Sequence, residues 1–335
     1  MFGWICQDLT CQELDKLHVL RRGSGIIRAS MITTQPPHPY DRRTHLIELR
    51  STVLGVQKRF YIYTPPGYDH GDLLPALYFF RGHEREWINA NEDPTRAGRT
   101  LIDVYEELLA AGTVGPMALV FPGIASDDNS VPGLLVNFKQ PELTTASGIG
   151  TGQFEEYFLH ELIPFVQRHY HVDPSARSVD GFSLGGFQAV KIAAQHPHLF
   201  RSVGAFDGTY FWDDRRNAAQ IARSDALFPK PFFDAAFGVP RDGQYGGNNN
   251  PINLVRNGDA NALQRLTWII EHGPRSAEPN QSNYYRGERL LKVLHAQGVK
   301  NKGRGAMEDA IHTWHWNHEH MRHALPLHWQ AMRTH

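Results

Sequence analysis

Residues 177–186 read RSVDGFSLGG, and this stretch decides the fold. The apolar run at 177–182 predicts a strand, and residues 184–196 predict a helix. Between them, Gly181 to Gly185 matches the pattern G-x-S-x-G, with Ser183 at its centre. Flanking glycines allow a tight strand-to-helix turn that lifts the serine hydroxyl above the sheet. The stretch therefore predicts a nucleophilic Ser183 in an α/β fold.

Short apolar strands alternate with helices on both sides of this turn, which is typical of a mainly parallel central sheet flanked by helices. Two earlier strands, at 46–49 and 56–63, predict an antiparallel pair that opens the sheet. The remaining strands are expected at 77–80, 118–121, 203–206 and 266–270, and the remaining helices at 101–108, 154–170, 284–296 and 316–332.

The chain of 335 residues is long enough for one large α/β domain or two smaller ones, and length alone does not choose between them. Residues 1–40, which contain several prolines and glycines, are expected to form an N-terminal extension, and 41–335 the domain itself. Residues 208–262 interrupt the alternation with glycines and a run of asparagines. They predict a cap-like insertion near the active site.

A serine hydroxyl needs a histidine to accept its proton and a carboxylate to orient that histidine. In hydrolases with this turn the order along the chain is serine, acid, histidine, so the base is expected near the end of the chain. His312, just before the last helix, fits best. Glu278, in the loop after the strand at 266–270, is the first choice for the acid, with Glu271 and Asp207 as rivals.

The oxyanion hole, which binds the negative oxygen of the reaction intermediate, is expected to use backbone N–H groups. One should come from Leu184, directly after the nucleophile, and the other from His83, in the loop after the strand at 77–80. Four aromatic residues could line the substrate pocket or belong to the core: Trp87, Tyr210, Trp212 and Trp314.

Charge and composition exclude several classes of partner. Asp and Glu number 35 against 34 Lys and Arg, and the net charge of −1 creates no global field for nucleic acid or an anionic membrane. A small-molecule substrate is expected, and a homo-oligomer is left open. The N-terminus lacks a secretory signal and no apolar stretch is long enough to cross a membrane, so a cytoplasmic protein is expected.

No cofactor motif is found. Histidines crowd the C-terminal region after His312, and His315 and Glu319 lie one helical turn apart. Recognised zinc spacings are absent, so no metal site is expected, and these histidines are interpreted as surface or core-edge residues.

The chain resembles the putative esterase family of α/β-hydrolases, which includes enterochelin esterases, esterase D-type S-formylglutathione hydrolases, feruloyl esterases and mycolyltransferases. The resemblance covers about residues 44–332 and rests on several segments: YTPPGYD at 63–69, ELIPF at 161–165, the turn at 180–186, HP at 196–197 with Phe200, and HTW at 312–314. Two features depart from the family pattern: Arg81 stands where members often have histidine, and the expected acid is a glutamate in a longer loop.

This resemblance implies a single α/β-hydrolase domain that cleaves carboxylic esters through an acyl-serine intermediate, without a cofactor. Ser183 would attack the ester carbonyl while His312 accepts its proton. Two alternatives remain at this point: acyl transfer to an alcohol by the same residues, and a non-catalytic binding protein that kept the fold.

Overall fold

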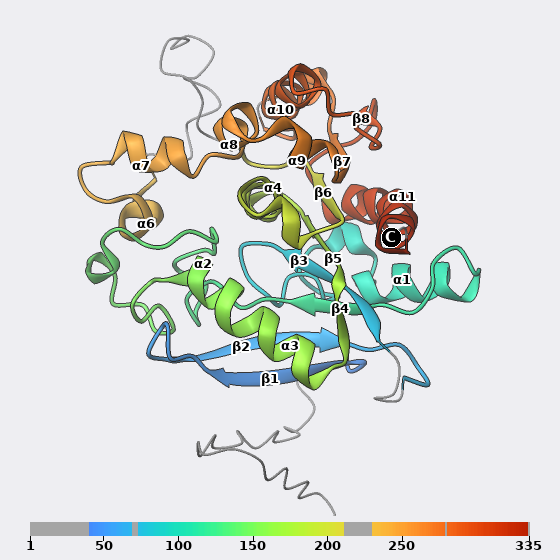
Figure 1. The fold of residues 1–335 in the computed structure, drawn as a ribbon, viewed down its shortest axis with the longest axis horizontal. Coiled ribbons are helices and arrows are strands. Elements are labelled where there is room, and N and C mark those ends of the chain that lie inside the picture. Colours follow the sequence, from blue (N-terminus) through green and yellow to red (C-terminus); the bar gives the residue numbers. More distant parts are fainter. Residues whose placement is uncertain (1–39, 69–72, 211–229, 279, 334–335) are drawn as a thin grey trace, which may run out of the picture. The chain divides into compact units, whose positions relative to one another are not determined.

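The computed structural model describes residues 40–68, 73–210, 230–278 and 280–333. Eight strands within these ranges form one sheet in the order β1-β2-β4-β3-β5-β6-β7-β8 (Figure 1). The strands are β1 (Thr44–Arg50), β2 (Gln57–Tyr63), β3 (Leu74–Phe80), β4 (Ala118–Phe121), β5 (Val172–Gly181), β6 (Ser202–Phe206), β7 (Thr267–His272) and β8 (Gly305–Ala306). The order and the flanking helices are those of an α/β-hydrolase, as predicted.

The first two strands form the antiparallel hairpin that the sequence predicts, with Thr44 opposite Tyr63 and Arg50 opposite Gln57. β2 then pairs with β4 in antiparallel fashion, and the strands from β4 through β8 run parallel to one another. Because parallel strands end at the same edge, the carboxyl ends of β3, β5, β6 and β7 all deliver side chains to one edge of the sheet.

Helices cover both faces of the sheet. α1 (Leu101–Ala110) and α11 (Trp314–Arg333) pack against each other on one face (Figure 1). The other face carries α3 (Ile163–His169), α4 (Leu184–Gln195) and α10 (Tyr284–Ala296). α2 (Phe154–Tyr157) leads into α3.

The pleat of the central strands explains the two cores. In β3, Ala76, Tyr78 and Phe80 belong to the core under α4, whereas Leu77 and Phe79 belong to the core under α1 and α11. Side chains of a strand alternate between the faces of a sheet, so a strand covered on both faces must be apolar throughout. This is why β3 and β4 appear in the sequence as continuous apolar runs.

The predicted helix at 154–170 is interrupted. Residues Phe158–Leu162 form a π-helical turn, in which Ile163 N–H donates to the carbonyl of Phe158. Pro164 lies one residue later, and its ring cannot fit against the carbonyl four residues before it in an α-helix. The wider turn accommodates the proline, so α2 and α3 are separate helices.

Part of the predicted insertion at 208–262 is described. Its described residues form a 3-10 helix (Pro231–Phe233) and four short α-helices between β6 and β7: α6 (Asp234–Phe237), α7 (Gly243–Asn248), α8 (Pro251–Asn257) and α9 (Ala260–Gln264). α8 packs against α4 and α10. The N-terminal extension that was expected at 1–40 lies outside the described residues, except for Tyr40.

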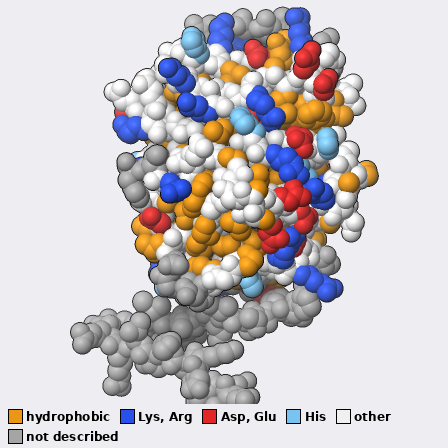
Figure 2. Space-filling model, turned by 90° about the vertical axis from the view of Figure 1, so that its right-hand side faces the viewer, with side chains coloured by type: hydrophobic (Ala, Val, Ile, Leu, Met, Phe, Trp, Pro, Cys, Tyr) orange, Lys and Arg blue, Asp and Glu red, His pale blue; other side chains and the backbone are white. Residues whose placement is uncertain are grey.

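The surface that carries α1 and α11 shows acidic and basic side chains interspersed (Figure 2). Arg322 of α11 bonds to Glu107 of α1 at 2.7 Å, and Arg99 also pairs with Glu107. Opposite charges therefore neutralise each other on this face. In the described part of the chain, no helix is long and apolar enough to cross a membrane.

Candidate active site

The turn between β5 and α4 is a strained strand-to-helix elbow, as the sequence predicts. Ser183 has φ 59° and ψ −118°, a conformation that L-residues rarely adopt. A Cβ on Gly181 would lie 2.1 Å from the backbone of Gly185, and a Cβ on Gly185 would lie 1.8 Å from the carbonyl oxygen of Phe80. The glycines thus provide space for close packing, while the serine itself takes the positive φ.

The structure brings His312 and Ser183, the predicted base and nucleophile, together. Its Nε2 lies 3.0 Å from Ser183 Oγ, and its ring packs on Phe182 with 4.7 Å between ring centroids. The His312 backbone N–H donates to Gln281 O at 2.8 Å, which fixes the segment that carries the ring. The His312 side chain keeps 28% of its surface exposed, so one side of the ring remains open to a substrate or to water.

The prediction that Glu278 orients this histidine is wrong. Asp207 Oδ2 lies 2.5 Å from His312 Nδ1, and the other ring nitrogen of His312 faces Ser183. Glu278 instead accepts the backbone N–H of Tyr285 at 3.0 Å, and burial raises its pKa. Asp207 directly follows β6, one strand earlier in the chain than the position expected for the acid.

Asp207 is fully buried and well supplied with hydrogen-bond donors. Its Oδ1 accepts the backbone N–H groups of Asn283 at 2.8 Å and Gly273 at 3.2 Å. Asn283 Nδ2 donates to the Asp207 carbonyl at 2.7 Å. These bonds hold the aspartate backbone at φ 47° and offset the cost of burying its charge. Sequence reasoning missed Asn283, because no motif marks a residue that acts through backbone contacts.

The two N–H groups expected to form the oxyanion hole differ in their hydrogen bonding. Leu184 is the first residue of α4, and its N–H makes no hydrogen bond within the described residues, so it is free to bind a negative oxygen. The second expected donor is occupied: His83 N–H donates to Glu86 Oε1 at 2.7 Å. The expectation for His83 is therefore wrong in this conformation, because a carboxylate takes up its amide.

The expected pocket aromatics are mostly core residues. Trp87 has no exposed surface and donates its indole N–H to Phe80 O at 3.1 Å, so its assignment to the pocket wall is wrong. Trp314 packs edge-on against Trp87 and Phe182 and is almost completely buried. Tyr210 is likewise buried. Trp212 lies outside the described residues.

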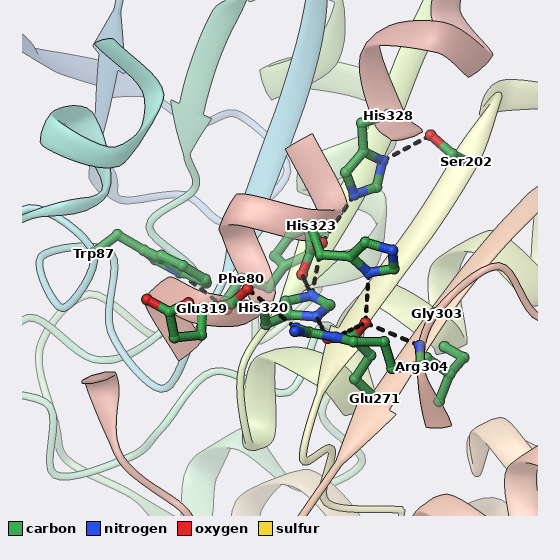
Figure 3. A network of polar contacts seen from close by, with 12 residues as sticks. Phe80, Trp87, Ser202, Glu271, Gly303, Arg304, Glu319, His320, His323 and His328 are labelled. Carbon is green, nitrogen blue, oxygen red and sulfur yellow. Dashed lines mark hydrogen bonds and ion pairs between the residues drawn. The ribbon is translucent and has the colours of Figure 1, made fainter. Parts of the chain in front are cut away.

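Three histidines of α11, His320, His323 and His328, belong to a network of polar contacts (Figure 3), whereas His315 is exposed, as the sequence predicts for a surface residue. His320, His323 and Arg304 converge on Glu271, with contacts of 2.9, 2.6 and 2.7 Å. His328 contacts Ser202 at 2.7 Å and Asp180 at 2.8 Å. Asp180 belongs to β5, the strand that leads into the elbow.

His320 is the centre of this network. It bridges Glu271 and Asp180, the latter at 3.3 Å. Burial opposes its charge, but the Asp180 and Glu271 carboxylates outweigh burial and raise the His320 pKa to about 9. Across the described residues, no group of three or more histidine, cysteine, aspartate or glutamate side chains is arranged to hold a metal ion.

Comparison with known proteins finds similarity to S-formylglutathione hydrolases. S-formylglutathione hydrolase of Paracoccus denitrificans is 27% identical over 161 residues, which are 47% of this chain and 54% of that protein. The mouse enzyme of the same name is 27% identical over 48% of this chain and 55% of its own length. The matched region thus spans about half the length of these curated relatives.

Two solved structures share the fold. A ferulic acid esterase superposes with a TM-score of 0.63 at 18% identity, covering 86% of this chain and 98% of that one. An S-formylglutathione hydrolase from Agrobacterium tumefaciens gives the same TM-score and identity, with 86% and 95% covered. The model of the family described as Putative esterase matches residues 51–231, more than half of the sequence. The chain therefore belongs to the Putative esterase family of α/β-hydrolase proteins.

Proposed function

We propose that this protein is a serine hydrolase that cleaves carboxylic esters of small molecules through an acyl-serine intermediate. The observation that carries the proposal is the continuous chain of contacts from Ser183 Oγ through His312 to Asp207, with distances of 3.0 and 2.5 Å. Membership of an esterase family and the similarity to S-formylglutathione hydrolases support the same reaction class.

In the first half-reaction, Ser183 Oγ attacks the ester carbonyl while His312 Nε2 takes the hydroxyl proton. Asp207 accepts the Nδ1–H bond and stabilises the imidazolium that forms. The negative oxygen of the tetrahedral intermediate binds the N–H of Leu184 at the N-terminus of α4, where the helix dipole also favours negative charge.

The intermediate then collapses: the bond to the leaving alcohol breaks, and the imidazolium donates its proton to the alcohol oxygen. Water attacks the acyl-serine in the second half-reaction, with His312 again as base, and releases the acid. An alcohol in place of water would give acyl transfer by the same residues.

The start of the insertion between β6 and β7 touches the nucleophile. Thr209 N–H donates to Ser183 O at 3.0 Å, and Thr209 Oγ1 lies 3.5 Å from Ser183 Oγ. We therefore expect the insertion at 208–262 to shape the substrate pocket.

Turnover of 4-nitrophenyl butyrate by the wild type and by Ser183→Ala tests the proposal. Loss of the nucleophile is expected to reduce kcat by about 10⁴-fold or more, because without Ser183 no acyl-enzyme forms. Circular dichroism and thermal unfolding of both proteins provide the control for folding. Equal turnover by both proteins would contradict the proposed function.

A further inference from the structure

Arg81 stands at the end of β3, beside the elbow. Its guanidinium lies over the ring of Phe182, with 4.8 Å from Cζ to the ring centroid, and 5.7 Å from the Trp314 ring. Phe182 directly precedes the nucleophile, and its ring also contacts His312. One aromatic ring therefore supports both the catalytic histidine and the arginine, which places a cation at the edge of the active centre.

The charge of Arg81 is incompletely matched. Its Nε lies 3.1 Å from Glu86 Oε2, but the N–H is not directed at the carboxylate and makes no hydrogen bond. The other carboxylate oxygen of Glu86 accepts a hydrogen bond from the backbone N–H of His83. Within the described residues, the two terminal nitrogens of Arg81 have no hydrogen-bond partner, and they are not among the atoms sealed from solvent.

A second cation, Arg96, lies against the same tryptophan ring as Arg81. Arg96 lies 3.6 Å from the centroid of the Trp314 ring, on the residue that also contacts Arg81. Its terminal nitrogens donate to the carbonyls of Asn89 and Glu86 rather than to a carboxylate. Burial lowers the pKa of Arg96 to about 9. Glu86 is thus the carboxylate in direct contact with Arg81.

We propose that Arg81 is a specificity residue that selects esters carrying a carboxylate, which its free terminal nitrogens bind while Ser183 attacks the ester carbonyl. A guanidinium offers two parallel N–H groups to a carboxylate, and its flat face is held in place by Phe182. The Arg81 side chain keeps 17% of its surface exposed. A substrate carboxylate can therefore reach the guanidinium from solvent, while the aliphatic part of the side chain stays packed. This inference rests on the proposed ester hydrolysis and names its substrate class.

The carboxylate could lie on the acyl part or on the alcohol part of the ester, and two pairs of substrates distinguish these two positions. The acyl pair is 4-nitrophenyl hydrogen adipate and its neutral methyl ester. The alcohol pair is 4-butyryloxybenzoate and 4-butyryloxybenzamide. For each pair, the readout is the ratio of kcat/KM for the anionic ester to kcat/KM for the neutral ester.

The wild type is expected to prefer the anionic member of one pair, and Arg81→Gln to lower that ratio by about ten- to hundredfold, the value of a charge-assisted hydrogen-bonded pair. Arg201→Gln is the matched control. Arg201 donates to the Ser175 carbonyl at 2.6 Å and precedes β6, so it lies at the amino ends of the strands, at the opposite edge of the sheet from Ser183. Arg201→Gln should leave both ratios at the wild-type value. Unchanged ratios in Arg81→Gln, or no anionic preference in the wild type, would overturn the proposal.

Two further variants keep the outcome unambiguous. Glu86→Gln removes the carboxylate that competes with the substrate for Arg81, so the anionic-to-neutral ratio of kcat/KM should rise severalfold. A ratio that stays constant or falls in this variant counts against the proposal, even if Arg81→Gln does not fold. Ser183→Ala should abolish turnover of all four esters. If Ser183→Ala retains turnover, the proposed function fails, whereas a failure confined to the ratios concerns Arg81 alone.

Discussion

Two buried carboxylates stand at the ends of neighbouring strands, and they have different roles. Asp207 follows β6, and Glu271 lies on β7 opposite Phe206, with Asp207 N–H donating to the Glu271 carbonyl at 2.8 Å. Asp207 contacts one histidine, which is open on one side and reaches Ser183. Glu271 is surrounded by His320, His323 and Arg304.

The difference shows that burial and a histidine partner do not define a catalytic acid. His320 has no exposed surface and its second nitrogen faces another carboxylate, Asp180, so it has no substrate to act on. His312 uses its second nitrogen on a hydroxyl and keeps solvent access. We infer that the Asp207 pair serves the chemistry, whereas the Glu271 network holds β5, β7 and α11 together.

The largest effect is expected from Asp207→Asn. An amide at this position no longer stabilises the imidazolium and favours the wrong tautomer of His312, so kcat should fall by about 10³- to 10⁴-fold. Steady-state hydrolysis of 4-nitrophenyl butyrate measures it. Glu278→Gln is the control and should stay near the wild-type rate; the opposite ranking of these variants would restore Glu278 as the acid.

Glu271→Gln should act on stability instead. Removing one partner of a buried ion pair costs about 3–5 kcal/mol of unfolding free energy, because it leaves the buried His320 with one of its two carboxylates. Urea unfolding gives this free energy. Glu319→Gln removes a more exposed partner of Arg322 and should change stability by less than about 1 kcal/mol. Equal losses of unfolding free energy in Glu271→Gln and Glu319→Gln would mean that the Glu271 network contributes no more to stability than an exposed ion pair.

The pH dependence of stability follows from His320. Its pKa in the folded protein is about 9, above the ordinary value of 6.5, so its contribution is complete below about pH 6.5 and is lost as the pH rises through 9. The free energy of unfolding should fall by up to about 3 kcal/mol over this range. Chemical unfolding at a series of pH values measures the slope, which should flatten in His320→Gln. An equally steep slope in that variant would exclude His320 as its source.

The smallest effect is expected from Asn283→Ala, which removes the amide that holds the Asp207 carbonyl. Loss of one hydrogen bond near the acid should lower kcat/KM by about five- to tenfold. Asn261→Ala, on exposed α9 surface, is the matched control. If both variants retain the wild-type kcat/KM, Asn283 has no positioning role.

Much of this molecule could be predicted from its sequence. Strands covered on both faces appear as apolar runs, and β4 at 118–121 has the predicted bounds. The conformation of the elbow depends on residues close together in the sequence, so Ser183 could be placed there from residues 177–186 alone. His312 followed from chain order alone.

The remaining features depend on long-range contacts. We propose Asp207 as the acid in place of the β7-loop residue Glu278, because three residues distant in sequence, Gly273, Asn283 and His312, contact its side chain. Likewise, Glu86 occupies the His83 amide through a local side-chain contact that no spacing rule predicts. Trp87 and Trp314 could not be assigned to core or pocket without knowing which face of the sheet they cover.

The most direct test of the account is the rate at which a fluorophosphonate modifies Ser183 in the wild type, Asp207→Asn and Glu278→Gln, with the adduct located by peptide mass. This reaction reports activation of the nucleophile and does not depend on substrate choice. We predict rapid labelling of Ser183 in the wild type and Glu278→Gln, and labelling slowed by orders of magnitude in Asp207→Asn. Labelling of another residue, or equally fast labelling of Ser183 in Asp207→Asn, would contradict the Ser183–His312–Asp207 assignment.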